Sequence, residues 1–153
     1  MSFRSYPPWL QRTMARALVA TVVLASLFVL AFYAGEDNAS ITGQWKITAA
    51  LDEAETTSLD EREARQFVGR VFTISKEKVI FGKRACGPPE FSAQRVEPGL
   101  FLRKQYQATA DKLGLPNPVT VVDLSCTSVF IKNHNNVVIA WHGWFFDAVR
   151  IKR

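Results

Sequence analysis

The segment VTVVDLSCTSVFIKNHNNVVIAWHGWFFDAVRI, residues 119–151, determines the fold class of this chain. It is rich in β-branched and aromatic residues and breaks into short runs that each resemble a β-strand. The runs are 119–126, 129–132, 137–142 and 144–151. Their connections are short, and Asn135-Asn136 suits a tight turn because asparagine tolerates positive φ. Strands joined this closely predict an antiparallel sheet.

The chain before this segment also carries strand patterns. In residues 41–50 apolar side chains alternate with Thr, Gln and Lys, which is typical of a half-buried strand. Residues 70–75 and 78–82 predict a hairpin around Lys76-Glu77, and residues 91–96 predict a further strand. With about eight strands, we expect a mainly β domain, a small antiparallel β-barrel or rolled sheet, because closure removes the sheet edges.

Helices are expected only beside this sheet. Ser58-Leu-Asp-Glu61 has the form of a capping box and predicts a short early helix of about ten residues. The stripe that this helix would bury comprises Ala64, Phe67 and Val68, and Gly69 is placed to end it. Residues 52–57 are predicted to be a polar connection. Residues 100–113 fit either strand or helix, and we favour a short helix over 108–113, ended by Gly114.

Residues 17–34, ALVATVVLASLFVLAFYA, form an apolar run without charge. Nineteen uncharged residues lie between Arg16 and Glu36, and a helix of that length spans roughly 28 Å, close to the hydrocarbon thickness of a bilayer. The head of the chain carries arginines and no acid, which keeps it in the cytoplasm and places the C-terminal part outside. The expected parts are a cytoplasmic tail (1–16), a membrane segment (17–34), a linker (35–40) and an exported β-domain (41–153).

Two interpretations of residues 17–34 remain open. As an uncleaved signal-anchor, the segment would hold the protein in the inner membrane by a single pass, with the β-domain in the periplasm. As a signal peptide cleaved after Ala31, it would release the domain into the same compartment. The domain is exported in both cases, so nucleic acid is disfavoured as a partner.

Cys86 and Cys126 are the two cysteines of the chain, and both lie in the exported part. An even count in an oxidising compartment predicts one disulfide. The chain has no C-x-x-C motif and no histidine close in sequence to either cysteine. A structural bridge is therefore favoured over a redox pair or a metal site.

Gly43-Gln-Trp45 opens the first strand, and Arg150 stands near the end of the last one. This pairing resembles the lipocalins and the wider calycin barrels, in which an N-terminal Gly-x-Trp places its indole across the closed end and a basic residue of the last strand packs on it. The resemblance implies structural roles for Trp45 and Arg150, joined by cation–π attraction. A ligand cavity does not automatically follow, because so small a barrel can be filled by its own side chains. If a cavity exists, we expect it to be lined by Phe72, Ile74, Phe81, Trp144 and Phe146.

Residues able to do chemistry are few. His134 lies in a polar turn and His142 lies on a strand, and two histidines without carboxylates at ligand spacing make no metal motif. Ser125, Asp123 and His142 would supply a nucleophile, an acid and a base if the fold assembled them. No Gly-x-Ser-x-Gly and no phosphate-binding glycine loop accompanies them. We expect no enzymatic activity, no cofactor and no metal.

Charge and aromatic residues are unevenly placed. Residues 36–63 hold eight acids, and residues 64–153 hold fourteen basic residues against six acids. The basic part would suit anionic lipid heads, cell-wall polymer or an acidic protein, unless it is simply a mixed solvated surface. Trp141, Trp144, Phe145 and Phe146 lie within six residues. A strand displays both faces, so one large ring must be exposed or covered, and the early helix is the simplest cover.

Two functions remain open at this point. In the first, the chain is a non-enzymatic, exported or membrane-anchored binding module that holds an apolar ligand or binds and inhibits a partner protein. In the second, it is a membrane-tethered accessory or assembly subunit of an envelope complex. The first predicts an internal cavity, whereas the second predicts a solid core with an exposed aromatic or basic patch that becomes protected only in the complex.

Overall fold

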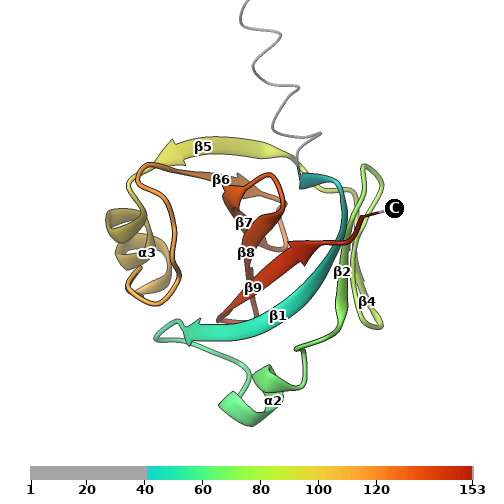
Figure 1. Cartoon of the computed structure of the whole chain (residues 1–153), viewed down its shortest axis with the longest axis horizontal. Helices are drawn as coiled ribbons and strands as arrows, with labels where there is room; N and C mark the ends of the chain where they lie inside the picture. The colour runs from blue at the N-terminus through green and yellow to red at the C-terminus, as the bar shows by residue number, and fades with distance from the viewer. Residues whose placement is uncertain (1–40, 153) are drawn as a thin grey trace, which may run out of the picture. The chain divides into compact units, whose positions relative to one another are not determined.

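The computed structural model describes residues 41–152, which form one curled sheet with the helices α2 and α3 beside it (Figure 1). The predicted cytoplasmic tail (1–16), membrane segment (17–34) and linker (35–40) lie outside the described residues, as does Arg153. No helix within residues 41–152 is both long enough and apolar enough to cross a bilayer.

The sheet confirms the mainly β prediction and contains nine strands in the order β4-β3-β2-β1-β9-β8-β7-β6-β5. The strands are β1 (Gly43–Glu53), β2 (Val71–Ile74), β3 (Val79–Phe81), β4 (Arg84–Cys86), β5 (Ser92–Val96), β6 (Val119–Asp123), β7 (Ser128–Asn133), β8 (Asn136–Trp141) and β9 (Trp144–Arg150). Every pairing between neighbours is antiparallel. The expectation of a strand from each apolar run therefore holds, and β4 is a strand that the sequence did not reveal.

β1 is the longest strand and joins the two halves of the sheet. It pairs with β2 on one side and with β9 on the other, with Trp45 opposite Arg150 and Glu53 opposite Trp144. Two register shifts along the β1–β9 pairing allow it to bend, and Figure 1 shows its continuous curve. β1 extends to Glu53, so the prediction of a polar connection from residue 52 was wrong at its first two residues.

The sheet is curled but not closed, because its two edges cannot pair. Eight antiparallel steps separate β4 from β5 in the sheet, so these two edge strands run in the same direction. Pairing them would require a parallel crossover of about a dozen residues or more. Only residues 87–91 connect them, and Pro88 and Pro89 cannot donate to a ladder. The expected rolled sheet is therefore present as a half-barrel with an open seam.

The predicted disulfide between Cys86 and Cys126 is present, with a Cα–Cα distance of 6.4 Å. Cys86 ends the edge strand β4, and Cys126 lies in the turn between β6 and β7 near the other edge. The bridge therefore ties the two sides of the open seam together where backbone hydrogen bonds do not.

The helices differ from the prediction in position. The capping box is formed by Asp60 and Glu63, each side chain accepting from the other's backbone N–H, and α2 spans only Glu61–Arg65. Ser58 is not the N-cap; its hydroxyl contacts His142 instead.

α3 spans Pro98–Tyr106, so the favoured helix over 108–113 was wrong. Pro98 begins this helix, because the missing N–H of proline costs nothing at the first helical position. The Glu97 carboxylate accepts from the backbone N–H groups of Gly99 and Leu100, and these bonds hold the pKa of Glu97 below its ordinary value.

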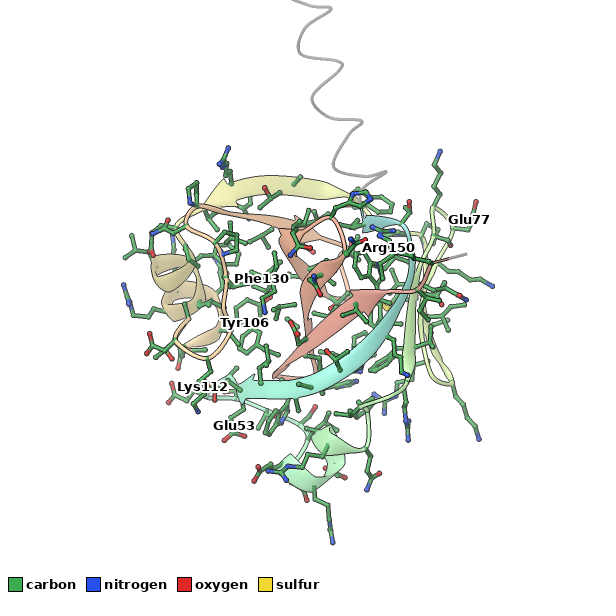
Figure 2. The ribbon with its side chains drawn as sticks, in the orientation of Figure 1. Glu53, Glu77, Tyr106, Lys112, Phe130 and Arg150 are labelled. Atoms are coloured by element: carbon green, nitrogen blue, oxygen red, sulfur yellow. A yellow bond between two sulfur atoms is a disulfide. The ribbon has the colours of Figure 1, made fainter. Side chains whose placement is uncertain are left out.

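Both faces of the central strands are buried. Trp144 and Phe146 of β9 pack inside the curl, whereas Phe145 points to the outer face. There Tyr106 of α3 covers it, with 5.2 Å between ring centroids, and burial raises the pKa of the tyrosine. Figure 2 shows Tyr106 and Phe130 facing one another between α3 and the sheet. The ring that was expected to need a cover is thus covered by α3 and not by the early helix.

Candidate functional site

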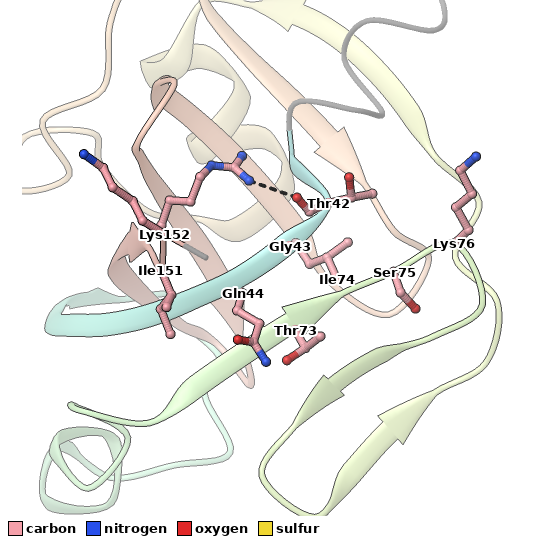
Figure 3. Close-up of a pocket in the computed structure, with 10 residues that line it drawn as sticks. Thr42, Gly43, Gln44, Thr73, Ile74, Ser75, Lys76, Ile151 and Lys152 are labelled. Carbon is pink, nitrogen blue, oxygen red and sulfur yellow. Dashed lines mark hydrogen bonds between the residues drawn. The ribbon is translucent and has the colours of Figure 1, made fainter.

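The Trp45–Arg150 pair predicted from the sequence forms at the end where β1 begins and β9 finishes. The Arg150 guanidinium carbon lies 4.1 Å from the centre of the Trp45 ring, and the indole N–H donates to the Ile41 carbonyl at 2.8 Å. Arg150 also donates from Nη1 to the Thr42 carbonyl (the dashed line in Figure 3) and from Nε to the His134 carbonyl. Burial lowers the pKa of Arg150. The pair seals this end of the inner core.

A hollow of about 650 Å³ lies beside this seal and is lined from Thr42 to Gln44, from Thr73 to Lys76 and from Arg150 to Lys152 (Figure 3). It adjoins both ends of the described chain. We assign no function to it.

The five residues predicted to line a ligand cavity are brought together in the inner core. They are Phe72, Ile74, Phe81, Trp144 and Phe146, with exposed fractions between 0 and 6%. The Phe72 and Phe81 rings lie 5.1 Å apart, and the Trp144 indole donates to the Leu59 carbonyl. They pack on one another as a core does, and their contact with a ligand stays a prediction.

A second pocket, of about 300 Å³, lies at the opposite end of the strands, where β3 and β8 finish and β2 and β9 begin. We name it the Arg70 pocket. Its lining residues are Leu59, Phe67, Arg70, Phe81, Gly82, Lys83, Arg84, Trp141 and His142. They come from the β1–β2 connection, the β3–β4 turn and the β8–β9 turn, so three segments far apart in sequence build one site.

Three cations surround the mouth of this pocket. Phe72 pairs with Phe81; Arg70 comes two residues before Phe72, and Lys83 comes two residues after Phe81, in the β3–β4 turn. Arg70 Nη1 lies 3.9 Å from where a Cβ on Gly82 would stand, so its side chain reaches over the β3–β4 turn. Arg84 follows that turn directly as the first residue of β4. Among residues 41–152, no carboxylate oxygen lies within 4.0 Å of any of the three.

The wall of the pocket is aromatic. The Phe67 and Phe81 rings stack with centroids 4.9 Å apart, and the edge of Trp141 meets Phe81 at 5.5 Å. The Arg70 guanidinium carbon lies 5.1 Å from the centre of the Phe67 ring, which orients its charge along the wall. The pocket therefore combines an apolar surface with positive charge at its rim.

The prediction that His142 lies on a strand was wrong, because β8 ends at Trp141. His142 is held in the β8–β9 turn, where both His142 (φ 53°) and Gly143 (φ 83°) adopt the left-handed conformation of a type I′ hairpin. Its Nε2 lies 2.6 Å from Arg84 Nη1, and its Nδ1 lies 3.0 Å from the Ser58 hydroxyl. A guanidinium only donates, so Nε2 accepts and the proton resides on Nδ1. Burial, followed by the Arg84 charge, lowers the pKa of His142. The imidazole thus orients Arg84 as a neutral acceptor.

The arrangement of Ser125, Asp123 and His142 considered from the sequence does not form a catalytic unit. All three line one shallow pocket, but Asp123 accepts from the backbone N–H of Ser125 and His142 faces Ser58 and Arg84. The Ser58–His142 pair has the proton on the nitrogen that faces the hydroxyl, so the ring cannot take the proton of Ser58. Within the described range, no cluster of three His, Cys, Asp or Glu side chains could hold a metal ion.

Sequence reasoning missed the cations of the Arg70 pocket. One turn signal was present, since His142-Gly143 stands between apolar runs, whereas Gly82-Lys83 precedes the polar Arg84. Arg70 and Lys83 flank the hairpin predicted around Lys76-Glu77, but the approach of His142 to Arg84 depends on pairing between strands distant in sequence.

The chain matches none of the protein-family models, curated proteins or solved structures with which it was compared.

Proposed function

We propose that this protein is a non-enzymatic binding module, held at or exported across the inner membrane by residues 17–34, that recognises its ligand or partner through the Arg70 pocket. The observation that carries the proposal is the set of three cations around an aromatic wall, with no carboxylate from residues 41–152 beside them. Charged groups of one sign gathered at a pocket attract ligands of the opposite sign.

The architecture supports the same proposal. A lipocalin-like module would have three features of this domain. Its first and last strands pair, the Trp45 indole lies under Arg150 at one end, and a pocket lies at the other end. In this proposal the inner core serves as a scaffold, and recognition takes place at the rim formed by the turns.

Native mass spectrometry of the protein gently extracted from its own membranes tests the proposal. The wild type and a matched control, Arg95→Gln on the exposed strand β5, should retain the same bound species. The double variant Arg70→Gln, Arg84→Gln should lose it. Retention of that species by the double variant would contradict recognition through this pocket.

A second candidate function is a membrane-tethered accessory subunit of an envelope complex. The tight packing of the five predicted cavity residues favours it, because a subunit needs no internal cavity. This function predicts a co-purifying protein assembly that is lost when residues 1–34 are removed. A binding module would keep its bound species after the same truncation.

A further inference from the structure

Two charges of the Arg70 pocket are oriented by contacts within the protein. Arg70 lies over the Phe67 ring, and Arg84 donates to the neutral His142 ring. Neither guanidinium is neutralised by a carboxylate in the part of the chain that the structure describes. Guanidinium groups match the planar, two-oxygen geometry of a carboxylate, and those held in place lose little freedom when they bind one.

The aromatic wall and the volume of the pocket indicate the shape and size of the uncharged part of the ligand. Phe67, Phe81 and Trp141 contribute apolar ring atoms to the lining. Phe81 stacks on Phe67, Arg70 lies over Phe67 and Trp141 meets Phe81 at a right angle, so the rings favour edge-on contact with another flat ring. A volume of about 300 Å³ is at the small end of the range for ligand pockets. A bare inorganic anion would leave this wall in water, and a neutral ring would leave the cations unpaired.

We infer that the Arg70 pocket binds a small aromatic carboxylate, with its carboxylate between Arg70, Lys83 and Arg84 and its ring against Phe67, Phe81 and Trp141. This inference rests on the proposed function and specifies the class of ligand. The binding is non-covalent, and neither the ligand nor the protein is chemically changed.

Calorimetric titration of the full-length protein in lipid nanodiscs, with empty nanodiscs subtracted, tests this inference. The probes are 1-naphthoate, its neutral analogue 1-naphthalenemethanol, and inorganic phosphate. We expect 1-naphthoate to bind at least about tenfold more tightly than either of the others, and to weaken as NaCl rises from about 50 to about 500 mM. If 1-naphthalenemethanol binds as tightly as 1-naphthoate, the charges do not contribute to recognition. If phosphate binds as tightly as 1-naphthoate, the aromatic wall does not contribute. Absence of naphthoate binding up to its solubility limit would overturn the whole inference.

Matched variants locate the site. Arg70→Gln should weaken 1-naphthoate binding about tenfold or more, because hydrogen bonds to charged groups contribute that much. Arg95→Gln carries the same charge change on β5 and should leave the affinity unchanged. Equal losses in the two variants would show a general electrostatic effect and reject the site. Lys83→Gln, at an exposed turn position, provides a second test if Arg70→Gln fails to fold.

The outcome separates this inference from the proposed function. If naphthoate does not bind, but the species seen in native mass spectrometry is still lost from the Arg70→Gln, Arg84→Gln variant, the pocket is a recognition site for another ligand class. If that species is retained as well, both proposals fall.

Discussion

Trp45 fills one end of the inner core with its buried indole. Its side chain is 1% exposed, covered by Arg150 on one face and hydrogen-bonded to the chain at Ile41. Trp45→Ala should cost about 3–5 kcal/mol in the free energy of unfolding, since it opens a large cavity. Chemical denaturation measures this, with Trp45→Phe as the milder comparison. A cost below ~1 kcal/mol for the alanine variant would contradict the buried placement.

His142 gives the protein a pH dependence of known sign. Its pKa is lowered by burial and by Arg84, so the unfolded chain binds a proton at a higher pH than the folded protein does. Above the ordinary histidine pKa of about 6.5, His142 does not lower the free energy of unfolding. Below that pH the free energy of unfolding falls, until the pH drops past the pKa of His142 in the folded protein. His142→Asn keeps a residue that tolerates the left-handed turn and removes the titration.

The measurement is the difference in unfolding free energy between about pH 8 and about pH 5, for the wild type and for His142→Asn. Other groups titrate equally in both proteins, so the wild type should lose more stability than the variant. An identical or smaller loss in the wild type would show that the pKa of His142 is not lowered.

At the scale of elements, the β8–β9 turn is fastened to the β1–β2 connection. A Cβ added to Gly143 would lie 2.5 Å from the Thr56 carbonyl oxygen, and the residue has a positive φ. Gly69 has a similar φ of 88°, but nothing lies within 4 Å of its added Cβ. Alanine at Gly69 would therefore introduce backbone strain alone, whereas alanine at Gly143 would introduce both strain and a steric clash.

Gly69→Ala should cost about 1–3 kcal/mol from strain alone, and Gly143→Ala should cost clearly more because the β1–β2 connection must also move. Urea unfolding of both variants measures the difference. Equal costs would mean that the two segments are not in contact.

How much could be predicted from the sequence also differs between elements. The strands with alternating or continuous apolar residues were predictable because their periodicity is local, as in residues 43–47 and 137–141. β4 has three polar or small residues and becomes a strand only by pairing with β3. α3 was missed because a Pro-Gly pair such as Pro98-Gly99 is typical of a turn, although proline also starts helices.

The candidate site was harder to predict than the strands, because it is built from turn residues of several segments. Each residue of the Arg70 pocket lies in or beside a turn. The local β2–β3 hairpin brings Arg70 to the β3–β4 turn, whereas His142 reaches Arg84 through pairing between strands distant in sequence. The Trp45–Arg150 contact was predictable because a motif was present at each end of the domain. No comparable motif links Arg70 with Arg84 and His142.

For the whole molecule, the Cys86–Cys126 bridge should stabilise the open seam. It closes a loop with a sequence separation of 40, which corresponds to about 4 kcal/mol in the chain-entropy model. The double variant Cys86→Ser, Cys126→Ser should therefore unfold at a lower urea concentration than the wild type. The unreduced, denatured wild type should take up no thiol label, and quantitative labelling would refute the bridge.

The seam has a further consequence for chain connectivity. Read from β5, the sheet order is 5-6-7-8-9-1-2-3-4, which is the order of a plain meander whose chain begins at β5 and ends at β4. The two ends of the described residues 41–152 lie together, since the Ile151 N–H donates to the Gln44 carbonyl. A circular permutant cut within residues 87–91, with a short linker from Lys152 to Ile41, would thus have a loop between every pair of adjacent strands. Its longest-range pairing, β1 with β9, becomes local, so stopped-flow refolding should be faster than in the natural chain.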